Sequence, residues 1–72
     1  MIVLAYKDMN TNICEFRANS ASEIAYLPTT ISGGTGNLST VAHCASGSSC
    51  FVTSTGDIYF LNGDTNTWNL LE

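Results

Sequence analysis

The order of apolar and polar residues predicts two β-strands at the start of the chain. Residues 2–6 form a continuous apolar run, which is typical of a strand covered on both faces. Residues 13–18 alternate between two faces. One face would hold Ile13, Glu15 and Arg17, and the other would hold Cys14, Phe16 and Ala18. The polar stretch "KDMNTN" contains turn formers, so the two strands are expected to pair as a hairpin with a six-residue loop.

A second β-rich region is predicted in the C-terminal half. Alternation indicates strands over residues 38–44, 50–54, 57–61 and 67–71. The last three would form an antiparallel meander. Its alternation places Ile58 and Phe60 on one face, Tyr59 and Leu61 on the opposite face, and Trp68 and Leu70 together on the final strand. Because aromatic side chains bury large areas, those of the meander are expected to form the core.

The turn between the last two strands has two interpretations. Asn62-Gly63 is a strong hairpin signal, because both central residues of a type I′ turn need positive φ and these two tolerate it. The turn can also extend through "GDTN", which would make a loop of four or five residues.

A short helix is predicted between the two β regions, within "NSASEIAYLP". Ser20 and Glu23 have the spacing of a capping box, and Ile24 and Leu27 follow at helical spacing. Pro28 disfavours the helical region at the residue before it, so the helix ends there. At no more than about two turns, such a helix must be held by packing onto the sheet.

Length and composition place these elements in one small domain, residues 1–72, of the mainly β class. The expected fold is a small antiparallel sheet or sandwich-like domain whose single short helix brings it to the margin of α+β. A chain of this length buries only about 60% of its unfolded surface, and small scaffolds commonly depend on disulfides, metal or partner subunits. Only 11% of the residues are charged, while 44% are hydrophobic, so the chain is expected to fold and to associate with partner subunits.

The charge balance excludes several partners. Two basic residues stand against six acidic ones, and the net charge is -4. Nucleic acids and anionic membranes both require a basic surface, so neither is expected as a partner. The five-residue apolar run at the start lacks a preceding basic residue and is too short for a signal peptide or a membrane span. A soluble product made in the cytoplasm is therefore expected.

No motif in the sequence predicts catalysis, a cofactor or a metal site. Cys14, Cys44 and Cys50 are interpreted as buried structural thiols; the alternative is a metal cluster of His43, Cys44 and Cys50, completed by Cys14. A nucleophilic pair of Cys50 and His43 is a further alternative. "TTISGGTGNLST" lacks the lysine of a phosphate-binding loop and is predicted to be a flexible loop.

From "SEIAYLPTT" through a Gly/Ser-rich loop to "GSSCFVTSTGDIYFLNGDTNTWNLL", roughly residues 20–71, the chain resembles a module of small tailed-bacteriophage structural proteins. The order of Leu27-Pro28-Thr29-Thr30, Gly56-Asp57-Ile58-Tyr59 and Thr67-Trp68 carries the resemblance. The insert "SGGTGNLSTVAHCAS" and the two nearby cysteines depart from that pattern.

This resemblance implies a non-enzymatic virion protein, synthesised in the host cytoplasm. It would be a capsid or head decoration, or a head-fibre or collar accessory subunit, stabilised by self-association or by docking on the particle. Its partners would be capsid, portal or tail proteins and further copies of itself. The alternative is a tail-associated adhesion module that binds a host surface glycan or receptor. The candidate interface or binding residues are Tyr6, Tyr26, Tyr59 and Trp68.

Overall fold

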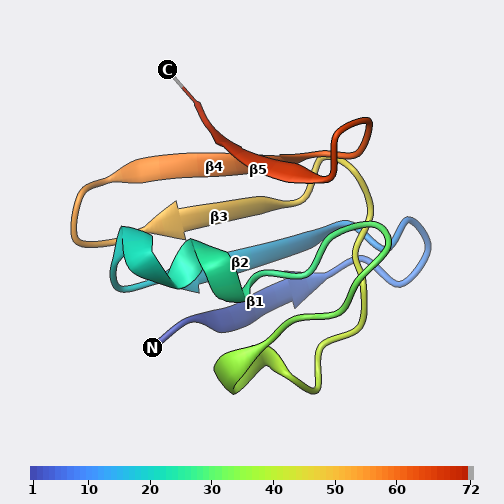
Figure 1. Ribbon diagram of the computed structural model, residues 1–72, viewed down its shortest axis with the longest axis horizontal. Helices are drawn as coiled ribbons and strands as arrows, with labels where there is room; N and C mark the ends of the chain where they lie inside the picture. Colours follow the sequence, from blue (N-terminus) through green and yellow to red (C-terminus); the bar gives the residue numbers. More distant parts are fainter. Residues whose placement is uncertain (72) are drawn as a thin grey trace.

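The computed structural model describes residues 1–71, which fold into one five-stranded sheet with strand order β1-β2-β3-β4-β5 (Figure 1). The strands are β1 (Val3–Lys7), β2 (Cys14–Ala18), β3 (Ser49–Val52), β4 (Asp57–Asn62) and β5 (Thr67–Leu70). Two short 3-10 helices, η1 (Ala21–Tyr26) and η2 (Gly36–Leu38), lie between β2 and β3. The predicted mainly β fold is therefore confirmed. Within residues 1–71 no helix has the length and apolar character needed to cross a membrane.

The strand pairing joins two locally formed units. The predicted hairpin of β1 and β2 and the predicted meander of β3, β4 and β5 are both present and antiparallel. Between them, β2 and β3 run parallel, with Glu15 opposite Ser49 and Arg17 opposite Phe51. A parallel pair needs a long crossover, which residues 19–48 supply. The two units therefore pair in parallel. The sheet as a whole is mixed rather than antiparallel throughout, and it is a single sheet rather than a sandwich.

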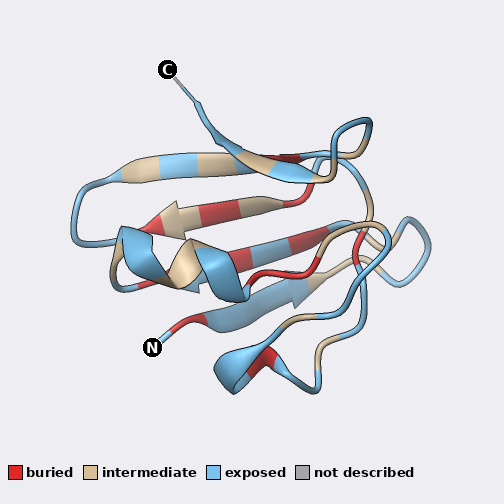
Figure 2. Ribbon diagram, in the orientation of Figure 1, coloured by how far each residue is buried: buried red, intermediate tan, exposed pale blue. Residues whose placement is uncertain are grey.

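The core lies on one face of this sheet. Alternate residues of β2 and β3 are buried, as the alternation in β2 predicts, and the crossover contributes further buried side chains (Figure 2). The buried hydrophobic residues are Ile2, Cys14, Phe16, Ala18, Leu27, Leu38, Cys44, Cys50, Val52 and Leu61. In the view of Figure 1, η1 lies in front of β2, so the crossover covers the core face and leaves the opposite face uncovered.

The start of η1 carries the predicted capping box. The Glu23 carboxylate accepts hydrogen bonds from the backbone N–H groups of Asn19 and Ser20, at 2.8 and 3.1 Å, and lies 3.3 Å from the amino group of Met1. Desolvation acts to raise the pKa of Glu23, but these contacts outweigh it and hold the pKa below its ordinary value of 4.5. The helix is of the 3-10 type and ends at Tyr26, before Leu27 and Pro28, as predicted.

The strand predicted over residues 38–44 is wrong. Leu38 belongs to η2, and the segment after it has no strand partner. Backbone hydrogen bonds hold this segment in an irregular path: the Gly34 N–H donates to the Val41 carbonyl, and the Cys44 N–H donates to the Thr29 carbonyl. A Cβ at Gly34 would lie 2.5 Å from the Leu38 carbonyl oxygen, so the glycine permits a close backbone approach. The glycine-rich stretch is therefore tied into the fold rather than free.

The type I′ turn at Asn62-Gly63 is also wrong, and the four-residue alternative is correct. β4 and β5 are joined by residues 63–66, and the positive φ falls on Asn66, at 54°. Gly63 is needed for a different reason. Its N–H donates to the Ser46 hydroxyl at 2.9 Å, and a Cβ at this position would lie 2.6 Å from the Ser46 Cβ.

β1 is not covered on both faces, contrary to its continuous apolar run. It is an edge strand that pairs only with β2, and Val3, Leu4, Ala5 and Tyr6 are all exposed. A β-bulge between Leu4 and Tyr6 interrupts the register with β2, a feature that commonly protects edge strands from unwanted pairing. An apolar run by itself cannot distinguish an edge strand from a central one.

Ser48 fixes the junction between the crossover and the sheet, and its removal is expected to destabilise the protein. Its fully buried hydroxyl accepts a hydrogen bond from the Cys14 N–H at 3.0 Å and donates to the Ala45 carbonyl at 2.7 Å. Ser48→Ala would leave that buried N–H unsatisfied and should lower the free energy of unfolding by about 1–3 kcal/mol, measured by urea titration. The neighbouring Ser49→Ala, on the uncovered face, is the control. Equal stability of the two variants would contradict this role.

Candidate functional site

The uncovered face of the sheet is the most prominent surface feature of the described residues. Side chains that alternate with the buried ones point to it, and strand register aligns them across four strands. This surface, called here the open face, comprises Val3, Tyr6, Glu15, Arg17, Ser49, Phe51, Ile58 and Phe60. Val3, Tyr6, Ile58 and Phe60 are between 36% and 58% exposed. Large apolar side chains that share one exposed surface indicate an interaction site.

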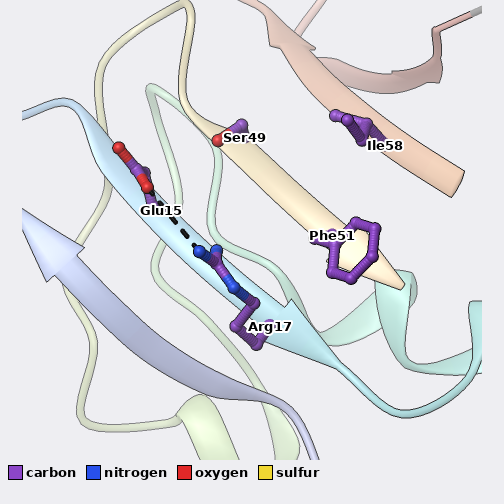
Figure 3. A pocket seen from close by; sticks show the side chains of 5 residues that line it. All are labelled: Glu15, Arg17, Ser49, Phe51 and Ile58. Atoms are coloured by element: carbon purple, nitrogen blue, oxygen red, sulfur yellow. Dashed lines mark ion pairs between the residues drawn. The ribbon is translucent and has the colours of Figure 1, made fainter. Parts of the chain in front are cut away.

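A shallow depression lies in the middle of the open face (Figure 3). It has a volume of about 370 Å³ and is lined by Glu15, Arg17, Ser49, Phe51 and Ile58. Ser49 has the smallest side chain of the five, and the other four side chains around it are much larger. The depression could therefore accept an apolar side chain from another molecule.

The charges of the open face cancel each other. The Arg17 guanidinium lies 4.0 Å from the Glu15 carboxylate, and both side chains are about half exposed, so this pair adds little to stability. Arg17 also donates a hydrogen bond to the Phe16 carbonyl, at 3.1 Å. The other charged side chains of the described residues lie on loops, on η1 or at strand ends. One of them, Lys7, is basic, and four are acidic: Asp8, Glu23, Asp57 and Asp64. The open face is thus neutral on a negatively charged molecule.

The pair of Cys50 and His43 considered as a nucleophile and base is not assembled. Cys50 is fully buried on the core face of β3, whereas His43 is exposed in the crossover. Burial is the main cause that raises the pKa of the Cys50 thiol to about 11; the nearby Arg17 acts to lower this pKa and Glu23 acts to raise it. This thiol remains protonated at neutral pH, and a protonated thiol is a poor nucleophile.

The alternative metal cluster is likewise not formed. In the part of the chain that the structure describes, no three His, Cys, Asp or Glu side chains are grouped so that they could hold a metal ion. Cys14, Cys44 and Cys50 are free and buried, and the Cys44 thiol donates to the Pro28 carbonyl at 3.8 Å. This environment agrees with the interpretation of the cysteines as structural thiols.

The four aromatic candidates do not form one surface. Tyr6 lies on the open face and is 58% exposed. Tyr26 lies at the end of η1, where its ring packs against Gly36. Tyr59 and Trp68 pack against the core, and the Trp68 indole N–H donates to the Pro28 carbonyl at 2.9 Å. Of the four, only Tyr6 is available on the open face.

Of the open-face residues, sequence reasoning named Tyr6 as a candidate interface residue and missed the other seven: Val3, Glu15, Arg17, Ser49, Phe51, Ile58 and Phe60. The alternation in β4 had already placed Ile58 and Phe60 together on one face. The missing signal was the parallel pairing of β2 with β3, which places Ser49 and Phe51 beside Glu15 and Arg17. Comparison of this chain with protein-family models, with curated proteins and with solved structures found no match.

Proposed function

We propose that this protein is a non-enzymatic structural subunit that acts by packing its open face against another protein surface. The observation that carries the proposal is the uncovered sheet face, on which apolar side chains of β1 and β4 are exposed on either side of the half-buried Phe51 of β3. A sheet with one solvated face usually presents polar side chains there. Apolar residues in those positions are accounted for when a partner covers them.

The small core supports the same proposal. The chain has 72 residues, and its buried residues lie on one face of the sheet and in the crossover above it. Scaffolds of this size gain little stability from a single core, and association is one of the common ways to add to it. Each additional Å² of apolar surface that association removes from water contributes about 25 cal/mol of stabilisation.

We further propose that the assembly is a tailed-bacteriophage virion, in which the protein is a capsid decoration, head-fibre or collar subunit. The support is the resemblance of residues 20–71 to phage structural modules. The residues that carry this resemblance also make fold-building contacts. The Pro28 carbonyl accepts a hydrogen bond from the Trp68 indole N–H, the Thr30 N–H donates to the Asn66 side chain, and Gly56 adopts a positive φ of 77° in the β3–β4 loop. The resemblance therefore concerns residues that hold the fold together. The surface through which the protein would bind its partners is inferred from the open face instead.

Incorporation into particles tests this proposal. The double variant Phe51→Ser/Phe60→Ser removes apolar area only from the open face, so we expect its occupancy in purified particles to fall by about tenfold or more, as for the loss of central interface anchors. Quantitative mass spectrometry of particles assembled in the presence of each variant measures the occupancy. The genes flanking this one are expected to encode capsid, portal or tail proteins.

The matched control is Met9→Ser/Ile31→Ser, which removes two apolar side chains that are 83% and 79% exposed outside the open face. This variant should be incorporated like the wild type. Equal occupancy of the two double variants would contradict a role for the open face, and flanking genes without any virion component would contradict the phage assignment.

A further inference from the structure

We infer that the partner of the open face is the open face of a second copy of this chain, which deepens the proposed function and rests on it. The two sheets would pack face to face about a two-fold axis in the interface. This axis would run across the strands at the level of Phe16, Cys50 and Tyr59, which lie side by side in the sheet register and point to the core. The result is a dimer of four layers, in which the two sheets meet through their open faces and each crossover lies on the outside.

Strand register divides the open face into two rows on either side of this axis. The first row contains Tyr6, Glu15, Ser49 and Phe60. The second row contains Val3, Arg17, Phe51 and Ile58. A two-fold rotation about the axis places the first row of one copy over the second row of the other. Every contact across the interface then occurs twice, as a two-fold dimer requires.

The two rows are complementary in charge. Glu15 of each copy would face Arg17 of the other copy, so the loose pair within the chain, at 4.0 Å, becomes part of a network of four alternating charges. The open face has no net charge, while most other charged groups of the described residues are acidic. Two copies therefore repel each other least when they meet through their open faces.

The two rows are also complementary in size. Ser49 of each copy would face Phe51 of the other copy, so the ring enters the depression over the serine (Figure 3). Phe60 would face Ile58, and Tyr6 would face Val3, so that apolar side chains meet apolar side chains. A large side chain opposite a small one lets the two layers interdigitate at the spacing of about 10 Å found between packed sheets.

The available area limits the strength of the dimer. The Cα trace measures 29 × 26 × 19 Å, and the view down its shortest axis shows the sheet broadside (Figure 1). An ellipse with the two longer dimensions covers about 600 Å² per copy, so a pair buries at most about 1,200 Å², the lower end of the range for specific interfaces. We expect a dimer that dissociates on dilution.

Charge exchange between two variants tests this geometry. Glu15→Arg makes both charges of the open face positive, and Arg17→Glu makes both negative, so each variant alone should dimerise about a hundredfold more weakly than the wild type. A mixture of the two should form a heterodimer, because each Arg then meets a Glu. Sedimentation velocity and native mass spectrometry of each variant and of the mixture measure these states. Both side chains are about half exposed, so both variants should fold, and circular dichroism checks this.

A size exchange provides a second test on neutral residues. Ser49→Phe should block the depression and weaken the dimer, while Ser49→Phe/Phe51→Ser should restore it, because the large and small residues again face each other. If the wild type is dimeric but the charge variants remain dimeric, another surface such as the edge of β1 mediates association; the inference fails and a self-associating structural subunit survives. If the wild type is monomeric at every concentration, the inference fails, and particle incorporation of the Phe51→Ser/Phe60→Ser variant decides the proposed function separately.

Discussion

Phe16→Ala is expected to lower the free energy of unfolding by about 3–5 kcal/mol, which approaches the whole stability of a domain of this size. Phe16 is fully buried on β2, in the middle of the core face. Its ring meets the Trp68 ring edge to face, with the ring centroids 6.0 Å apart and the planes at 83°. Removing the ring leaves a cavity that the sheet cannot close. Urea unfolding followed by Trp68 fluorescence and by circular dichroism measures the loss.

Phe51→Ala is the matched control, because it deletes the same side chain from the neighbouring strand on the opposite face. Phe51 is half-buried and borders the depression of the open face. In dilute solution, where copies are separate, its loss should cost about 1 kcal/mol or less. If the two substitutions destabilise the protein equally, the core is not confined to the face that carries Phe16.

Alkaline destabilisation is the second large effect that we expect. Burial raises the pKa of Cys50 from its ordinary value of 9.0 to about 11, with a smaller opposing effect of Arg17 and a raising effect of Glu23. Between these pH values the folded protein holds a proton that the unfolded chain releases. The contribution of this thiol is therefore fully present below pH 9.0 and is lost as the pH rises through about 11. A difference of this size corresponds to about 2–3 kcal/mol.

Burial also raises the pKa of Cys14 and of Cys44, so these thiols add to the loss in the same direction. Urea unfolding in reducing buffer, repeated at intervals from neutral pH to pH 11, measures the dependence. Cys50→Ala should have a visibly flatter profile, because it removes the most strongly shifted of the three thiols. A wild-type stability that is constant over this range would show that the thiols are accessible to water.

Features set by neighbouring residues could be predicted from the sequence. Alternation in β2 and β4 correctly assigned the faces of Phe16 and Leu61, and the spacing of Ser20 and Glu23 correctly predicted the start of η1. These features depend on a period of two residues or on a hydrogen bond three residues away. Local pattern is sufficient for both.

Features that depend on distant contacts could not be predicted in the same way. Residues 38–44 alternate like a strand, but Leu38 lies in η2 and is buried in the core, and among the described residues no strand pairs with this segment. The sequence predicts Gly63 as a turn residue with positive φ. Glycine is needed there because Ser46, 17 positions earlier in the chain, lies too close to leave room for a Cβ. The open face depends on the parallel pairing of β2 with β3 across residues 19–48, so its full set of residues emerges only from the folded sheet.

The dependence of thermal stability on protein concentration decides whether the open face is an interface between copies. Association stabilises only the folded state, so the midpoint of thermal unfolding should rise with concentration for the wild type and stay constant for Glu15→Arg. Trp68 fluorescence over a dilution series measures both midpoints. A wild-type midpoint that does not change with concentration, in a protein that sediments as a 7.7 kDa monomer throughout, would contradict the interface.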